Sequence, residues 1–183
     1  GILSSPGYLR SLWTHGQPRF GNLRPYTADT ADVNEVAAFV RREMGGAFTW
    51  DEVARYRERW KRPLVVKGIL HPSDAEKCVA LGVDGIIVSN HGGRDDDFGR
   101  STIDALPEII EAVDGKIPVL VDSGFRRGTD VVKALALGAR AVLLGRPPLW
   151  GLSVNGADGV RAVLEHFREE LVRALQKKTA IIR

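Results

Sequence analysis

The sequence contains little of several things, and each scarcity excludes a class of protein. Its single cysteine, Cys78, cannot form an internal disulfide, and zinc motifs built from cysteine pairs need more than one thiolate. No apolar stretch approaches the roughly 20 residues that a membrane-spanning helix requires. The net charge is only +3, an excess too small to indicate nucleic acid as a partner. A lone cysteine and an N-terminus without a recognisable signal peptide are typical of a cytoplasmic protein.

The sequence does contain enough apolar residues for a core. Hydrophobic residues make up 44% of the 183 positions and charged residues 27%, which is the balance of a globular protein rather than a disordered one. Residues 1–48 are rich in Gly, Pro, Ser and Arg, and we interpret them as a long loop that carries one amphipathic helix at residues 32–44. Residues 49–183 are expected to form the folded domain, beginning with a short helix capped by Thr49.

Short apolar segments alternate with helical segments from Pro63 onward. The expected strands are residues 64–66, 85–88, 119–121 and 141–144, and the expected helices are residues 73–80, 106–113, 129–137 and 157–176. Wholly apolar strands that alternate with helices predict a parallel sheet buried on both sides.

An internal repeat narrows the choice of fold. Residues 80–88 (ALGVDGIIV) align with residues 136–144 (ALGARAVLL), so one strand–helix–strand unit occurs twice. The repeat favours a (β/α)₈ barrel over an open doubly wound sheet, although periodicity alone leaves both open. A barrel needs eight strands. We therefore expect an α/β TIM barrel of which this chain supplies about the last four βα units, with two unpaired edge strands.

Polar, glycine-rich segments follow each expected strand, where the active site of a βα barrel forms. They are KG at residues 67–68, SNHGGR at 89–94, DSGFRRG at 122–128 and GRP at 145–147. Arg126 and Arg146 stand among glycines whose backbone N–H groups can approach an anion, which favours a phosphate site. The alternative is that the glycines make tight turns and the arginines are solvated.

Three further residues at these ends are candidates for binding or catalysis. His91 can take a proton near neutral pH, and Arg94 three residues later suits a carboxylate, so we favour a catalytic base over a structural histidine. Lys67 ends an apolar strand and needs an anionic partner, which is either Asp122 or an anionic cofactor. Cys78 is expected to be a small core residue on a helix.

The acidic run at residues 95–97 is expected to be a solvated turn, because consecutive carboxylates converge poorly on a metal ion. We therefore expect no metal site.

Together these segments resemble the FMN-dependent α-hydroxy-acid dehydrogenase and oxidase family, which includes glycolate oxidase, the flavin-type lactate dehydrogenases and mandelate dehydrogenase. The segments that carry the resemblance are VVKG at 65–68, SNHGGR at 89–94, DSGFRRGTD at 122–130, KALALGA at 133–139 and LGRP at 144–147. The match extends over roughly residues 50–176. The Ser-Gly-Phe sequence after Asp122 is most similar to mandelate dehydrogenase.

The resemblance implies FMN as cofactor and oxidation of an L-2-hydroxy acid, similar to mandelate, lactate or glycolate, to the 2-oxo acid. It makes His91 the base, and it makes His91 and Arg94 the substrate-binding residues. The implied cofactor-binding residues are Lys67, Ser89, Asp122, Ser123, Gly124, Phe125, Arg126, Gly145 and Arg146. The electron acceptor would be oxygen, a quinone or a cytochrome. Other phosphate-binding barrels are a further option. Nucleotide dehydrogenases of this fold need a cysteine in a loop, however, and Cys78 is expected to lie on a helix.

The sequence also departs from the family. The first four strands are absent, and residues 95–97 read Asp-Asp-Asp where the family usually has Gln-Leu-Asp, which adds negative charge beside the carboxylate site. The alternative function is therefore a non-catalytic half-barrel fragment that retains only a phosphate or FMN site. We expect the chain to form a homo-oligomer or to associate with the missing N-terminal half. Peripheral membrane association, as in some mandelate dehydrogenases, stays open.

Overall fold

The structure is a computed structural model, and it describes residues 6–16, 20–28, 32–44, 48–94, 96 and 98–181. The chain divides into two compact units, Gly1–Thr49 and Trp50–Arg183. Each unit is described by itself.

The first unit contains three helical segments, α1 (Pro6–His15), the 3₁₀ helix η2 (Gly21–Tyr26) and α2 (Val33–Met44). The helix expected at residues 32–44 is present as α2, and α1 and η2 lie in the part expected to be loop. Proline is tolerated at the first position of α1, where its missing N–H has no partner to lose. Gly16, with φ +71°, follows the last residue of α1, and its N–H donates to the Leu12 carbonyl at 2.9 Å. The rings of Tyr26 and Phe39 stack between η2 and α2.

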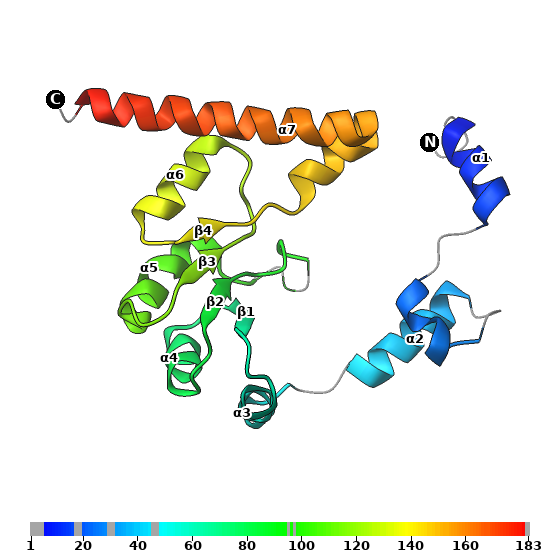
Figure 1. Cartoon of the computed structure of the whole chain (residues 1–183), viewed down its shortest axis with the longest axis horizontal. Helices are drawn as coiled ribbons and strands as arrows, with labels where there is room; N and C mark the ends of the chain where they lie inside the picture. Colours follow the sequence, from blue (N-terminus) through cyan, green and yellow to red (C-terminus); the bar gives the residue numbers. More distant parts are fainter. Residues whose placement is uncertain are drawn as a thin grey trace. The chain divides into compact units, whose positions relative to one another are not determined.

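The second unit is an α/β structure built on a parallel sheet. Its elements in chain order are α3 (Trp50–Arg59), β1 (Val65–Ile69), α4 (Pro72–Ala80), β2 (Gly85–Val88), α5 (Thr102–Val113), β3 (Val119–Val121), α6 (Gly128–Ala136), β4 (Ala141–Val142) and α7 (Arg146–Ile181). The strands pair in the order β1-β2-β3-β4, and every pairing is parallel (Figure 1). The predicted fold class, α/β with four consecutive βα units, is confirmed.

The hydrophobic core lies between the sheet and the helices that join its strands. Ile86 and Val88 of β2 are completely buried, whereas Ile87 between them is only half-buried. Successive side chains of a strand point to opposite faces, so the helices cover one face well and the other face less. On that other face Val65 of β1 keeps 47% of its surface exposed. The sequence predicts a sheet that is buried on both faces. Within this unit, only one face is well buried.

Two helices begin earlier than their sequence patterns predict. Helix α5 begins at Thr102 rather than at residue 106, because the Ser101 hydroxyl caps it by accepting the Asp104 N–H at 3.3 Å. Helix α7 begins at Arg146 and includes a segment before the helix expected at residues 157–176. The two parts of α7 meet at Asn155 and Gly156, whose backbone angles are not helical.

Glycines allow α7 to fold back on itself and to pack against α6. A Cβ atom on Gly151 would collide with the carbonyl oxygen of Gly159, so the two parts of α7 approach through bare backbone. A Cβ atom on Gly128, the first residue of α6, would likewise collide with the backbone N of Leu171. The Gly128 N–H donates to the Glu170 carboxylate at 2.7 Å, which joins the beginning of α6 to α7.

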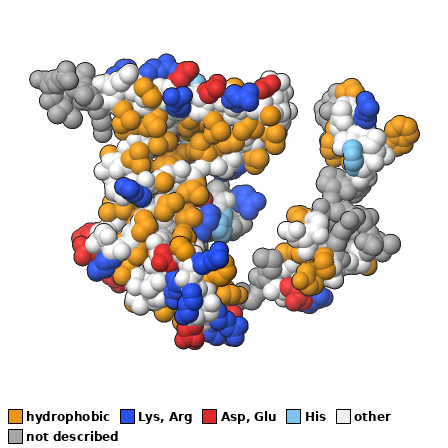
Figure 2. Space-filling view, in the orientation of Figure 1, with side chains coloured by type: hydrophobic (Ala, Val, Ile, Leu, Met, Phe, Trp, Pro, Cys, Tyr) orange, Lys and Arg blue, Asp and Glu red, His pale blue; other side chains and the backbone are white. Residues whose placement is uncertain are grey.

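Both edges of the sheet lack a strand partner within the described part of the second unit, since β1 pairs only with β2 and β4 only with β3. Hydrophobic side chains gather between α7 and the sheet in Figure 2, and the exposed ones on α7 include Leu149, Trp150 and Leu152. Unpaired edges and exposed apolar surface promote association.

We expect the chain to be dimeric or larger in solution, and a lysine on the edge strand to weaken that association. Val65→Lys places a charge on the exposed side of β1, where it opposes strand pairing. Sedimentation velocity should show a shift toward monomer. Gln176→Lys is the control, because it adds the same charge at an exposed polar residue of α7. A wild-type chain that sediments as a monomer at all concentrations would contradict the prediction.

Candidate functional site

A cavity of about 340 Å³ lies at the carboxyl ends of the strands. Segments that follow β2, β3 and β4 contribute to its lining together with Lys67, which lies within β1 and not after it as expected, because the strand continues to Ile69. The predicted site residues that line it are Lys67, His91, Arg94, Asp122, Ser123, Gly124, Phe125, Arg126, Gly145 and Arg146. Ser89 is the exception, because it is buried beside Lys67. Carboxyl ends of parallel strands meet at one edge of a sheet, and this brings together side chains that are far apart in the sequence.

Lys67 lines this cavity next to an irregular position in β1. Gly68 has φ +98°, and the pairing with β2 shifts register between Lys67 and Ile69. A bulge of this kind changes the direction of the side chains around it. A Cβ atom on Gly68 would lie 4.0 Å from Nε2 of His91, so the strand passes close to the imidazole ring.

Lys67 and Asp122 form an ion pair that connects the ends of β1 and β3. Nζ of Lys67 lies 3.1 Å from Oδ2 of Asp122 and donates to Oγ of Ser89 at 2.7 Å. Ser89 follows β2 and is only 1% exposed. It therefore fills the space between the ends of β1 and β3, the strands on either side of β2. Of the two partners expected for Lys67, the structure shows Asp122. The lysine side chain is still 40% exposed toward the cavity, so it can face a ligand as well.

The pKa of the Asp122 carboxyl group lies below its ordinary value. Partial burial raises this pKa, but hydrogen bonds from Ser89, Ser123 and Lys67 and the positive charge of Lys67 lower it by more. The Ser123 hydroxyl donates to Oδ1 of Asp122 at 2.7 Å. The group is therefore a carboxylate at neutral pH and balances the lysine charge.

His91 has a left-handed backbone conformation, with φ +55°, and Gly92 follows with φ +78°. This conformation costs a non-glycine residue about 1–2 kcal/mol, and hydrogen bonds hold it in place. The His91 N–H donates to Oγ of Ser89 at 3.2 Å. The Gly92 N–H is shared between Oδ1 of Asn90 at 3.1 Å and Oγ of Ser123 at 3.0 Å.

Arg94 is on the same loop as His91. Its Nε donates to the His91 carbonyl oxygen at 3.4 Å, and both residues line the cavity. A proton-accepting ring and a cation suited to a carboxylate therefore face the same space.

Two other arginines line the cavity. Arg126 lies on the segment between β3 and α6, and Arg146 is the first residue of α7. The Arg126 guanidinium lies over the Trp150 ring at 4.8 Å and donates to the Phe125 carbonyl at 3.2 Å. The Arg146 guanidinium donates to the Gly92 carbonyl at 2.7 Å. A Cβ atom on Gly92 would lie 2.8 Å from that guanidinium, so the two groups are in tight contact.

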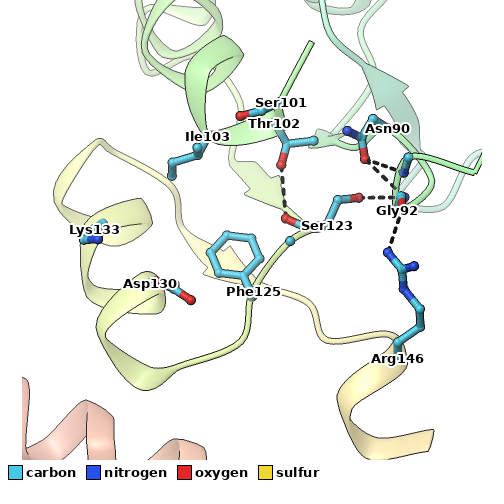
Figure 3. A pocket seen from close by; sticks show the side chains of 12 residues that line it. Asn90, Gly92, Ser101, Thr102, Ile103, Ser123, Phe125, Asp130, Lys133 and Arg146 are labelled. Atoms are coloured by element: carbon cyan, nitrogen blue, oxygen red, sulfur yellow. Dashed lines mark hydrogen bonds between the residues drawn. The ribbon is translucent and has the colours of Figure 1, made fainter. Parts of the chain in front are cut away.

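A second cavity of about 340 Å³ (Figure 3) shares five lining residues with the first, namely Gly92, Ser123, Gly124, Phe125 and Arg146. It lies beside the beginnings of α5 and α6, with Thr102 and Lys133 in its lining. Figure 3 shows Ser123 and Arg146 reaching Gly92 from two different directions. The region of the loop that carries His91 is thus braced from two other strand ends.

Sequence reasoning missed three residues that organise this site. Asn90 accepts two backbone N–H groups, and an Asn before a glycine pair is a recognisable turn signal. The Thr102 hydroxyl donates to the Asp122 carbonyl at 2.7 Å. Trp150 stacks with Arg126, and no short-range sequence pattern connects the two residues.

The expectation for Cys78 is confirmed, and the acidic run is only partly described. Cys78 is fully buried, and burial, followed by the charge of Asp74, raises its pKa to about 11. Of residues 95–97 only Asp96 is described. Among the residues that the structure describes, no group of three or more His, Cys, Asp or Glu side chains is placed to hold a metal ion, and no helix is long and apolar enough to cross a membrane.

Comparison with known protein families identifies the family to which this chain belongs. The family model described as "FMN-dependent dehydrogenase" matches residues 6–178. The chain belongs to the FMN-dependent dehydrogenase family. Members of this family depend on FMN, so the cavity at the strand ends can be compared with what that cofactor requires.

The similar proteins are 2-hydroxy-acid oxidases and dehydrogenases. The chain is 50% identical to 2-hydroxyacid oxidase 1 of Mus musculus over 144 residues, which is 79% of the chain, and 44% identical to (S)-mandelate dehydrogenase of Pseudomonas putida over 174 residues, which is 92% of the chain. A crystal structure described as the monotopic membrane protein (S)-mandelate dehydrogenase superposes with a TM-score of 0.84 at 42% identity over 93% of the chain.

The chain spans less than half the length of these relatives. It covers 39% of the mouse oxidase, 43% of the Pseudomonas dehydrogenase and 45% of the mandelate dehydrogenase crystal structure. Its four βα units therefore correspond to part of a barrel.

The lining of the first cavity fits a cofactor that carries a phosphate. The basic side chains around it are Lys67, Arg94, Arg126 and Arg146. Asp122 is the carboxylate among the described lining residues, and Lys67 already balances its charge. A Cβ atom on Gly124 or Gly145 would meet no described heavy atom within 4 Å, so the backbone there is open to an anion.

Asp122→Asn should destabilise the chain by on the order of 1–2 kcal/mol at neutral pH, because it leaves Lys67 without its counter-charge, with allowance for the partial exposure of the lysine. A carboxyl group with a lowered folded-state pKa stabilises the fold fully above its unfolded-state pKa, and this contribution is lost as pH falls through the folded-state pKa. The difference between the variant and the wild type should therefore vanish in acid.

Urea unfolding at a series of pH values measures this difference. Asp158→Asn is the control, since Asp158 forms an exposed pair with Arg161 on α7 and such pairs contribute little. A difference for Asp122→Asn that does not change with pH would show that the loss is not due to the carboxylate charge.

Proposed function

We propose that this chain provides the FMN-phosphate site, the catalytic base and a substrate-carboxylate site of an FMN-dependent enzyme that oxidises an L-2-hydroxy acid to the 2-oxo acid. One observation supports this most directly. Lys67 of β1 and residues that follow β2, β3 and β4 place His91, Arg94, Lys67 and two further arginines around one cavity, and the chain belongs to a family of FMN-dependent dehydrogenases.

Arg126 and Arg146 are proposed to hold the phosphate. Both guanidinium groups line the cavity, and each keeps N–H donors beyond the hydrogen bond described above. Gly124 and Gly145 would add backbone N–H groups, in the way that glycine-rich turns bind anions. Asp122 is proposed to accept hydrogen bonds from the ribityl hydroxyl groups.

His91 and Arg94 are proposed to act on the substrate. Arg94 would bind the carboxylate of the 2-hydroxy acid, with the planar donor geometry that suits this group. His91 would take the substrate proton at Nε2, the ring nitrogen that lies over Gly68. FMN, when bound, supplies the two-electron acceptor for this oxidation. Lys67 would place its positive charge at the wall of the cofactor cavity, next to Ser89 and Asp122.

The remaining four βα units are proposed to come from a partner segment, in the same polypeptide or in another. The unpaired edges of β1 and β4 and the half-covered face of the sheet support this. The relatives named as 2-hydroxyacid oxidase and (S)-mandelate dehydrogenase are more than twice as long as the part matched. Oxygen, a quinone or a cytochrome would be the final electron acceptor.

Loss of a phosphate-binding arginine should weaken FMN binding much more than riboflavin binding, because riboflavin has no phosphate. We expect Arg126→Met and Arg146→Met each to reduce FMN affinity by roughly ten- to a hundredfold, measured by quenching of flavin fluorescence. Arg140→Met is the matched control, since Arg140 is exposed just before the opposite end of β4. Equal losses for both flavins would exclude a phosphate role for these arginines.

His91→Asn should abolish most substrate oxidation and preserve FMN binding, because a positioned base contributes roughly 10²–10⁴-fold and asparagine tolerates a left-handed backbone. The test combines this chain with the first four βα units of a family relative and follows anaerobic bleaching of the flavin by an L-2-hydroxy acid. His166→Asn, an exposed histidine of α7, serves as control. A His91→Asn enzyme with wild-type bleaching rates would rule out the base, and FMN binding without any bleaching in the wild-type assembly would favour a non-catalytic flavin-binding role.

A further inference from the structure

We propose that Ser89 and Ser123 are positioning residues, which fasten the His91–Gly92 backbone to the Lys67–Asp122 ion pair. This inference rests on the proposed role of His91 as the base. It gives the two serine side chains a role within the protein's own structure, beyond the cofactor contact that the family resemblance implies.

Both acceptor positions of Ser89 are used within the protein. A serine hydroxyl can donate one hydrogen bond and accept two. Oγ of Ser89 accepts from Nζ of Lys67 at 2.7 Å and from the His91 N–H at 3.2 Å. The side chain is also buried and absent from the lining of the cofactor cavity.

Ser123 makes the corresponding connection from β3. Its hydroxyl donates to Oδ1 of Asp122 at 2.7 Å and accepts from the Gly92 N–H at 3.0 Å. Two consecutive peptide N–H groups, those of His91 and Gly92, are thus each accepted by a serine that also contacts the ion pair. The hydroxyls hold the two residues at which the backbone enters the left-handed region.

Backbone strain at Ser123 supports this role. Ser123 has φ +74°, a conformation that glycine adopts freely and serine does not. A strained residue persists only where the surrounding structure holds it. Here the hydroxyl supplies two hydrogen bonds that glycine would lack, which explains why a serine at this position can serve the site despite its backbone cost.

The consequence is a mechanical connection between the cofactor side and the substrate side of the cavity. Lys67 and Asp122 are proposed to face the cofactor, and a Cβ atom on Gly68 would lie 4.0 Å from Nε2 of His91. Because the serines connect the ion pair to the His91–Gly92 backbone, the orientation of the base depends on the ion pair being intact. The dependence runs through the backbone N–H groups of His91 and Gly92.

The test is hydrogen–deuterium exchange of single backbone amides in this chain, read by mass spectrometry with residue-resolving fragmentation. Ser123→Ala and Ser123→Gly should each speed exchange at the Gly92 amide by about three- to tenfold, as loss of one hydrogen bond implies. Ser89→Ala should do the same at the His91 amide. Ser123→Gly should also leave the urea midpoint unchanged or raise it, because glycine relieves the strain at φ +74°.

Ser101→Ala is the matched control. It removes the cap of α5 and should speed exchange at Asp104, with no change at His91 or Gly92. In the assembled enzyme, Ser123→Gly should slow flavin bleaching by substrate at least threefold while FMN affinity stays within twofold. This split separates a positioning role from a cofactor contact.

The outcomes distinguish the positioning role of the serines from the proposed function of the chain. Unchanged exchange at Gly92 in both Ser123 variants, or a large loss of FMN affinity with Ser123→Gly, would overturn the positioning role, whatever His91 does. If Ser123→Ala does not fold, Ser123→Gly still provides the test, since glycine fits the backbone there. Faster exchange together with an inactive wild-type assembly would keep the serine contacts and reject the proposed function instead.

Discussion

The ion pair between Lys67 and Asp122 is the interaction on which the arrangement of the site depends. It connects the ends of β1 and β3 across the buried Ser89 hydroxyl at the end of β2. Its two charges balance each other, and this allows a lysine to stand at the end of an apolar strand. The loop with His91 is built on this pair through hydrogen bonds from two consecutive backbone N–H groups.

The parallel sheet explains why the polar residues of the site lie apart from the hydrophobic core. Helices α4, α5 and α6 bury one face of the sheet, and the polar segments that follow the strands collect at one edge. The segments after the strands can therefore carry arginines, glycines and histidine without disturbing Ile86 or Val88 in the core. The same arrangement leaves the other face dependent on further βα units, in agreement with the partial coverage of the relatives.

Much of the second unit could be predicted from the sequence, because buried strands and glycine-terminated helices give strong local signals. The strands at β2 and β3, and the gathering of the site residues at one edge, follow from those signals. What could not be predicted depends on contacts between distant segments. Oγ of Ser89 accepts a hydrogen bond from Lys67 of β1, and the guanidinium of Arg126 stacks on Trp150 of α7. Helix α1 was missed because glycine and proline were read as loop, although Pro6 and Gly16 mark its two ends.

The contact between Gly92 and Arg146 has a consequence for how this sequence can change over evolutionary time. Position 92 is restricted twice, by a positive φ and by a guanidinium that occupies the space of a Cβ atom. A larger residue at position 92 would need both a tolerant backbone and a shorter side chain at position 146. The loop that carries the histidine and the segment that carries the last arginine thus constrain each other's substitutions, although they lie on different βα repeats.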